Sequence, residues 1–119
     1  MSTPREILAS IIRSVDGSFF KPIDFGDFSV SAQGSDFHYC SPRINLKNLI
    51  EYDSVEIAVF RMVDGEKCFV NIRNDKLFKD FVWADKFEDQ SHPVAPYISM
   101  TDVEKIITDV MIVSNRMKN

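Results

Sequence analysis

Glycine is scarce in this chain of 119 residues, and its four glycines stand far apart, at positions 17, 26, 34 and 65. This spacing excludes the glycine-rich loops that cradle the phosphates of nucleotides. Potential metal ligands are also few: the histidines and cysteines are His38, His92, Cys40 and Cys68. They lack the spacing of a structural zinc site. The sequence therefore predicts neither a cofactor nor a bound metal.

An excess of basic residues is also missing. The chain has 14 Lys and Arg residues against 18 Asp and Glu residues, which gives a formal net charge of -4. Proteins that bind nucleic acids through phosphate contacts need clustered Lys and Arg, usually on a basic domain. We therefore expect no nucleic-acid partner.

No hydrophobic run approaches the roughly 20 apolar residues that span a bilayer. The first apolar cluster, at positions 7–15, has the spacing of a helix face and contains Arg13, unlike the core of a signal peptide. We expect a cytoplasmic protein with no membrane partner. Two cysteines in a chain this short form no disulfide framework, so Cys40 and Cys68 are expected to be reduced and structural.

The composition that is present is that of a folded protein. Hydrophobic residues make up 45% of the chain, and ten Phe, three Tyr and one Trp supply large rings for a core. A chain of this length is typical of one domain with one core. Residues 1–119 are therefore predicted to form a single domain.

Both ends of the chain carry helix signals. Thr3, Pro4 and Glu6 have the spacing of an N-cap, a first helical residue and a capping box, and Gly17 is expected to end this helix. Near the other end, Thr101 and Glu104 have the same spacing. The second helix is predicted to bury apolar residues that recur at helical spacing: Val103, Ile106, Ile107, Val110, Met111 and Met117.

The segment between the helices reads as β-sheet. Asp64-Gly65 is a dipeptide typical of a type I′ hairpin turn, and a two-residue loop there places Phe60 opposite Phe69 and Ile57 opposite Ile72. A second hairpin is predicted from 28 to 40 around Gln33-Gly34. Residues 45–50 read as one helical turn or irregular linkage, 75–82 as a short helix, and 84–98 as a loop that leads to an extended piece at 97–98.

These elements predict an α+β fold with two layers. An antiparallel sheet of about four strands is expected to carry the N- and C-terminal helices on one face. In the hairpin, Ile57 and Val59 are predicted to face these helices. Phe60 and Phe69 are predicted to face away from them, and that opposite face is the candidate functional surface.

Residues for catalysis are hard to find. Nucleophilic catalysis needs a Ser or Cys, a His and an orienting carboxylate that converge in space, and no local motif marks such a set. We predict no catalytic residues and expect that the protein is not an enzyme. One alternative stays open: a small-ligand binder or enzyme with a site near Cys40, His38 and His92.

What remains is a surface for another protein, because aromatic residues and Met are enriched at interface centres. We expect a small acidic protein-binding or inhibitory module, of the kind represented by immunity proteins and phage accessory proteins, that acts by occluding its partner. A self-associating homodimer is a second alternative. The candidate binding residues are Phe60, Met62, Phe69, Trp83 and Phe87.

Overall fold

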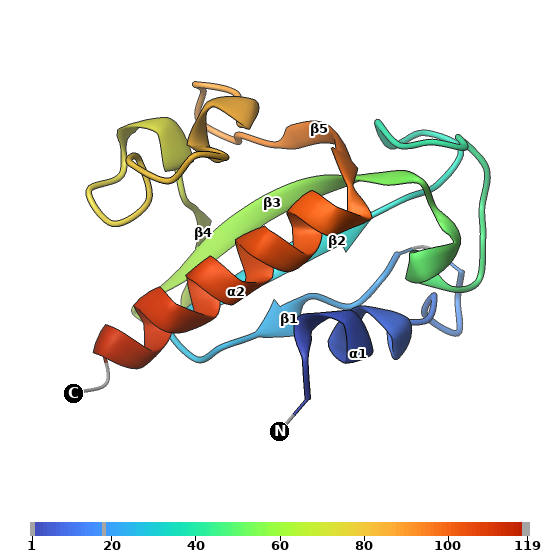
Figure 1. Cartoon of the computed structure of the whole chain (residues 1–119), viewed down its shortest axis with the longest axis horizontal. Helices are drawn as coiled ribbons and strands as arrows, with labels where there is room; N and C mark the ends of the chain where they lie inside the picture. Colours follow the sequence, from blue (N-terminus) through green and yellow to red (C-terminus); the bar gives the residue numbers. More distant parts are fainter. Residues whose placement is uncertain (1, 18, 118–119) are drawn as a thin grey trace.

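An antiparallel sheet forms the centre of the fold (Figure 1). The structure is a computed structural model, and it describes residues 2–17 and 19–117. Its elements in chain order are α1 (Pro4–Ala9), β1 (Ile23–Asp24), β2 (Phe28–Gln33), η1 (Leu49–Glu51), β3 (Ser54–Val63), β4 (Glu66–Phe69), η2 (Ile72–Asn74), η3 (Ala84–Lys86), β5 (Ala95–Ser99) and α2 (Met100–Met117), where η marks a single 3-10 turn.

Strand β3 organises the sheet, which has the order β1-β2-β3-β4. One edge of β3 pairs with β2. Its other edge is shared, because β5 pairs with residues 54–57 and β4 pairs with residues 60–63. All pairings are antiparallel. Because β4 and β5 share one edge of β3, the five strands occupy four positions across the sheet.

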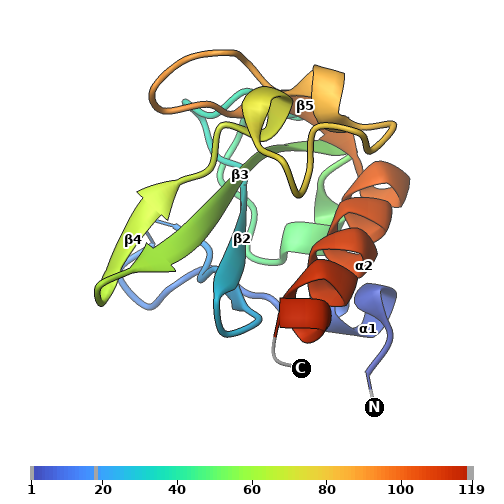
Figure 2. The same cartoon turned by 90° about the vertical axis from the view of Figure 1, so that its left-hand side faces the viewer.

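The two helices lie on one side of the sheet, which confirms the predicted two-layer α+β fold (Figure 2). We call this covered side the inner face. Its side chains alternate along the strands with those of the opposite, outer face. Six apolar inner-face residues of β2 and β3 are at most 3% exposed: Phe28, Val30, Ala32, Val55, Ile57 and Val59. Arg61 shares this face with Phe28, is partly exposed and binds Asp75 at 3.1 Å.

The hairpin between β3 and β4 has the predicted turn. Asp64 and Gly65 both have positive φ angles, of 51° and 82°, as a type I′ turn requires. Phe60 pairs with Phe69 as predicted. The predicted pairing of Ile57 with Ile72 is wrong, because β4 ends at Phe69 and β5 takes over that edge of β3.

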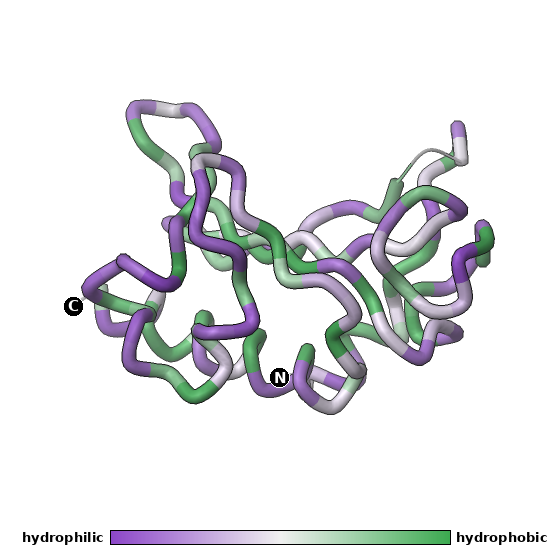
Figure 3. Tube along the Cα trace, turned by 90° about the horizontal axis from the view of Figure 1, so that it is seen from above, coloured by the Kyte–Doolittle hydropathy of each residue, from purple (hydrophilic) through white to green (hydrophobic). Residues whose placement is uncertain are grey.

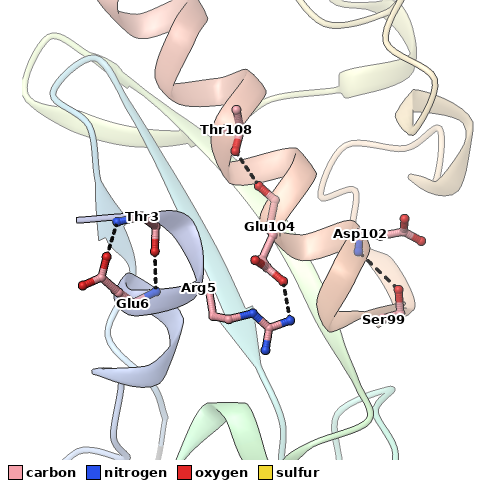
Figure 4. A network of polar contacts seen from close by, with 7 residues as sticks. All are labelled: Thr3, Arg5, Glu6, Ser99, Asp102, Glu104 and Thr108. Carbon is pink, nitrogen blue, oxygen red and sulfur yellow. Dashed lines mark hydrogen bonds and ion pairs between the residues drawn. The ribbon is translucent and has the colours of Figure 1, made fainter. Parts of the chain in front are cut away.

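Helix α1 starts as predicted and ends early. Thr3 and Glu6 form the capping box, with hydrogen bonds of 3.1 and 3.0 Å between side chain and backbone (Figure 4). The helix ends at Ala9 rather than near Gly17.

Backbone pairing explains the early end of α1. Arg13 N donates to Lys47 O at 2.7 Å, and Leu49 N donates to Ile11 O at 3.1 Å, so this segment forms a short ladder with the chain before η1. Ile12 and Val15, which belong to the apolar cluster with the spacing of a helix face, are 53% and 108% exposed.

Helix α2 is the main cover of the inner face, and its buried side is made of Val103, Ile106, Ile107, Val110, Val113 and Ser114. The expected cap at Thr101 is wrong, because Ser99 Oγ accepts from Asp102 N at 3.2 Å. The carboxylate of Glu104 instead binds Arg5 of α1 at 3.0 Å, which ties the two helices together (Figure 4).

The second predicted hairpin is not formed. Strand β2 exists but pairs with β1 and β3, and residues 34–40 form bends instead of a returning strand. The segment 75–82 forms turns rather than the predicted helix, whereas the extended piece at 97–98 is confirmed as part of β5.

Hydrophobic and hydrophilic residues are interspersed along the described part of the chain (Figure 3). Among the described residues, no helix is both long enough and apolar enough to cross a membrane.

Candidate functional site

The outer face of the sheet carries a different set of side chains from the inner face. Its β2 residues are polar, whereas its β3 and β4 residues become aromatic and apolar toward the hairpin. Both described α-helices lie on the other side (Figure 2). The outer-face positions are Ser29, Ser31, Gln33, Glu56, Ala58, Phe60, Met62, Lys67 and Phe69.

At the hairpin end of this face, Phe60, Met62 and Phe69 form a group that we call the hairpin patch. The rings of Phe60 and Phe69 lie 4.7 Å apart between centroids, and the ring of His92 meets Phe69 edge-on at 4.9 Å. Phe60 and Phe69 are half-buried, and Met62 is 40% exposed. These three predicted binding residues therefore lie together at the surface.

The other two predicted binding residues, Trp83 and Phe87, are in the core. Each is 1% exposed. Their segment folds onto the inner side of the sheet, where Phe78 meets Phe28 edge-on at 5.1 Å. The indole of Trp83 donates to Asp109 of α2 at 2.8 Å, which fixes the ring against the helix. The structure therefore places these two candidate binding residues in the core and not on the surface.

A second exposed group, the tyrosine patch, consists of Phe37, Tyr39, Arg43 and Tyr97. The two tyrosine rings lie 6.1 Å apart, and the guanidinium of Arg43 lies 5.7 Å from the centroid of Tyr39. Phe37 is 65% exposed, Tyr39 48% and Tyr97 52%. Sequence reasoning missed this group because it assigned residues 37–40 to a strand.

Tyr97 has an unusual backbone for a strand residue, with φ at 54°. Non-glycine residues in this region are strained, and such strain tends to occur at functional sites. The conformation is held by a hydrogen bond of 3.1 Å from Tyr97 N to Tyr39 O. No pattern in the sequence reveals this feature.

Residues 35–41, which we call the strap, place the tyrosine patch on the same side of the sheet as the hairpin patch. Tyr39 N donates to the outer-face carboxylate of Glu56 at 3.1 Å. Glu56 and Phe60 share one face of β3 and stand about 13 Å apart, given the rise of a strand. The tyrosine patch and the hairpin patch therefore flank Ala58 on the outer face.

The strap is closed by three of its own residues. Ser35 Oγ lies 2.7 Å from Nδ1 of His38, and Cys40 Sγ donates to Ser35 O at 3.2 Å. Ser35 and Cys40 are each 1% exposed. Both potential nucleophiles are thus enclosed, and they make contacts that fold the strap.

Burial lowers the pKa of the His38 imidazole, and it outweighs the neighbouring charges. The carboxylates of Glu56 and Asp36 raise the pKa, and the guanidinium of Arg13 lowers it further. His92 lies apart from this group, against Phe69. Within the described chain, no three His, Cys, Asp or Glu side chains are grouped so that they could hold a metal ion.

Two clefts adjoin the ladder at Ile11–Arg13. The larger has a volume of about 640 Å³ and the smaller about 340 Å³, and Ile12 lines both. The Arg13 guanidinium in the larger cleft donates to Leu46 O at 2.9 Å and to Tyr52 Oη at 2.8 Å. This cation holds the fold together, so we do not assign it a ligand.

Comparisons with known proteins give no further guide to the site: no family model matches the chain, and no significant match is found among curated proteins or solved structures.

Proposed function

We propose that this protein is a binding module that attaches to another protein through the outer face of its sheet and acts by occluding the surface it covers. The observation that carries the proposal is the pair of exposed aromatic groups on a face that neither α-helix covers. The contact residues would be Phe37, Tyr39, Arg43, Tyr97, Phe60, Met62 and Phe69.

The residue types support a protein partner. Tyr, Phe, Met and Arg are enriched where interfaces are most buried, and Tyr and Arg are among the commonest hot-spot residues. The two patches flank Ala58 on one face of the sheet, an arrangement that suits one interface rather than one small-molecule pocket. Occlusion needs no catalytic group, which agrees with the enclosed positions of Ser35 and Cys40.

The experiment is affinity capture from a lysate of the native organism, followed by mass spectrometry. We expect a stoichiometric protein partner that is lost with Phe60→Ser and with Tyr97→Ala. Val82→Ser is the matched control, because Val82 is 75% exposed and belongs to the segment on the inner side. A partner that binds all three variants equally would contradict the proposal.

Self-association is the competing reading, and a specific observation favours testing it. Strand β4 is at the end of the strand order, so its outward edge has no strand partner among the described residues. Such edges can pair with a second copy. Light scattering across a concentration series decides: a constant monomer mass supports a foreign partner, and a dimer that Phe60→Ser dissociates supports self-association.

A further inference from the structure

The hydroxyl of Ser35 has no spare hydrogen-bonding capacity. It accepts from Phe37 N at 3.1 Å and from His38 N at 3.1 Å. A serine hydroxyl offers two acceptor positions and one donor, so its proton is directed at the remaining contact, Nδ1 of His38 at 2.7 Å. This arrangement requires a neutral imidazole with its proton on Nε2.

Protonation of His38 is incompatible with this arrangement. A protonated Nδ1 is a donor and faces a hydroxyl whose acceptor positions are both occupied. The new N–H can be satisfied only if Phe37 N or His38 N leaves the hydroxyl. Either change alters the backbone that presents Phe37 and Tyr39, the two strap residues of the tyrosine patch.

The charged groups around His38 and its burial set the pH range in which the imidazole takes up a proton. Glu56 on β3 and Asp36 on the strap favour the charged form of His38, whereas Arg13 on the ladder segment disfavours it. Glu56 is in addition held by Tyr39 N at 3.1 Å. Burial dominates, and the pKa of His38 lies below its ordinary value of 6.5.

We propose that the strap is a pH-sensitive clasp: protonation of His38 breaks the Ser35 contact, rearranges the strap and weakens binding at the tyrosine patch. The effect on binding rests on the proposed function, whereas the release of the strap does not. The sign follows from linkage. The unfolded chain takes up the proton first as the pH falls, so the strap is most stable above about pH 6.5 and loses stability below it.

The test of release needs no partner. The full-length protein is titrated by NMR from about pH 7.5 to about pH 5, a range that spans the ordinary histidine pKa. The measurements are the His38 ring shifts and the exchange protection of the Phe37 and His38 amides, corrected for intrinsic exchange. We expect both amides to lose protection together with the His38 ring titration, at a midpoint below the ordinary histidine value of 6.5.

Two variants make the result specific. His38→Gln keeps an acceptor for the Ser35 hydroxyl and should make the protection independent of pH, whereas His92→Gln should leave the titration unchanged. Protection that stays constant while the His38 ring titrates in the native chain would overturn the clasp, whatever the variants do. A partner that stays bound after a measured release would contradict only the link to binding, so the two failures are distinguishable.

Discussion

Neighbouring residues of β3 serve two opposite faces, and the faces differ in what surrounds them. Val59 on the inner face is fully buried beneath the helices. Phe60 on the outer face is half-buried, and the centroid of its ring lies 4.7 Å from that of Phe69. The inner face of β2 and β3 is apolar except for Arg61, which pairs with Phe28 and binds Asp75 at 3.1 Å. The outer face mixes rings with serines and a carboxylate. The inner face therefore holds most of the buried apolar side chains of the sheet, whereas the outer face carries half-buried and exposed rings.

The largest expected effect is that of removing a ring from the inner side. Trp83→Ala deletes a side chain that is 1% exposed and its hydrogen bond to Asp109, and it should lower the free energy of unfolding by about 3–5 kcal/mol. Denaturant unfolding followed by circular dichroism measures this. Val82→Ala, at a neighbouring exposed position, is the control and should change stability by less than about 0.5 kcal/mol. Similar values for both variants would place Trp83 outside the core.

Added volume on the buried side should also be costly. A Cβ at Gly34 would lie 2.7 to 2.9 Å from three ring atoms of Tyr52. That ring cannot move aside easily, because its hydroxyl accepts from Arg13 at 2.8 Å and from Leu46 N at 2.9 Å. Gly34→Ala should therefore destabilise the fold by about 1–3 kcal/mol. Thermal unfolding tests this, and Gly65→Ala is not a suitable control because Gly65 has a positive φ.

The confirmed predictions concern features that neighbouring residues form. The capping box at Thr3 and Glu6 and the turn at Asp64-Gly65 are formed by side chains and backbone a few residues apart, and both are confirmed. Four residues of the predicted buried stripe of α2 are buried: Val103, Ile106, Ile107 and Val110. The prediction is wrong for the other two, because Met111 is only partly buried and Met117 is 49% exposed. The hairpin turn also fixed which residues of β3 and β4 share a face.

The remaining features depend on contacts between distant segments. Gly34 reads as a turn residue, yet its role is to admit the ring of Tyr52. Trp83 reads as a surface aromatic, yet Asp109 of α2 holds it inside. The tyrosine patch needs a strap that crosses the sheet to reach Tyr97, and no local pattern specifies this crossing. Sequence spacing alone therefore located one of the two patches.

The direct comparison of the two faces uses adjacent residues. Val59→Ala removes buried methyl groups and should cost about 1–3 kcal/mol. Phe60→Ser loses a cross-strand ring contact worth roughly 0.5–1 kcal/mol, and it should weaken partner capture much more than Val59→Ala does. Unfolding and capture are measured on both variants. If Phe60→Ser unfolds the protein and Val59→Ala has no effect, the two faces have been assigned in reverse.

The smallest expected effects compare two buried serines. Ser29, on the outer face, is 3% exposed, and its hydroxyl has no hydrogen-bond partner among the described residues. Ser114 of α2, which is fully buried, donates to Phe25 O at 2.6 Å. Ser29→Ala removes an unsatisfied polar group and should raise stability by about 1 kcal/mol or less.

Ser114→Ala leaves the carbonyl of Phe25 without this donor, so it should lower stability by about 1 kcal/mol. Chemical denaturation of the two variants side by side measures the difference, which is opposite in sign although the substitution is the same. Equal losses for both would mean that the Ser29 hydroxyl has a partner in solution. In that case a group from solvent or from a bound molecule reaches the outer face at Ser29, directly opposite Phe60 in the sheet.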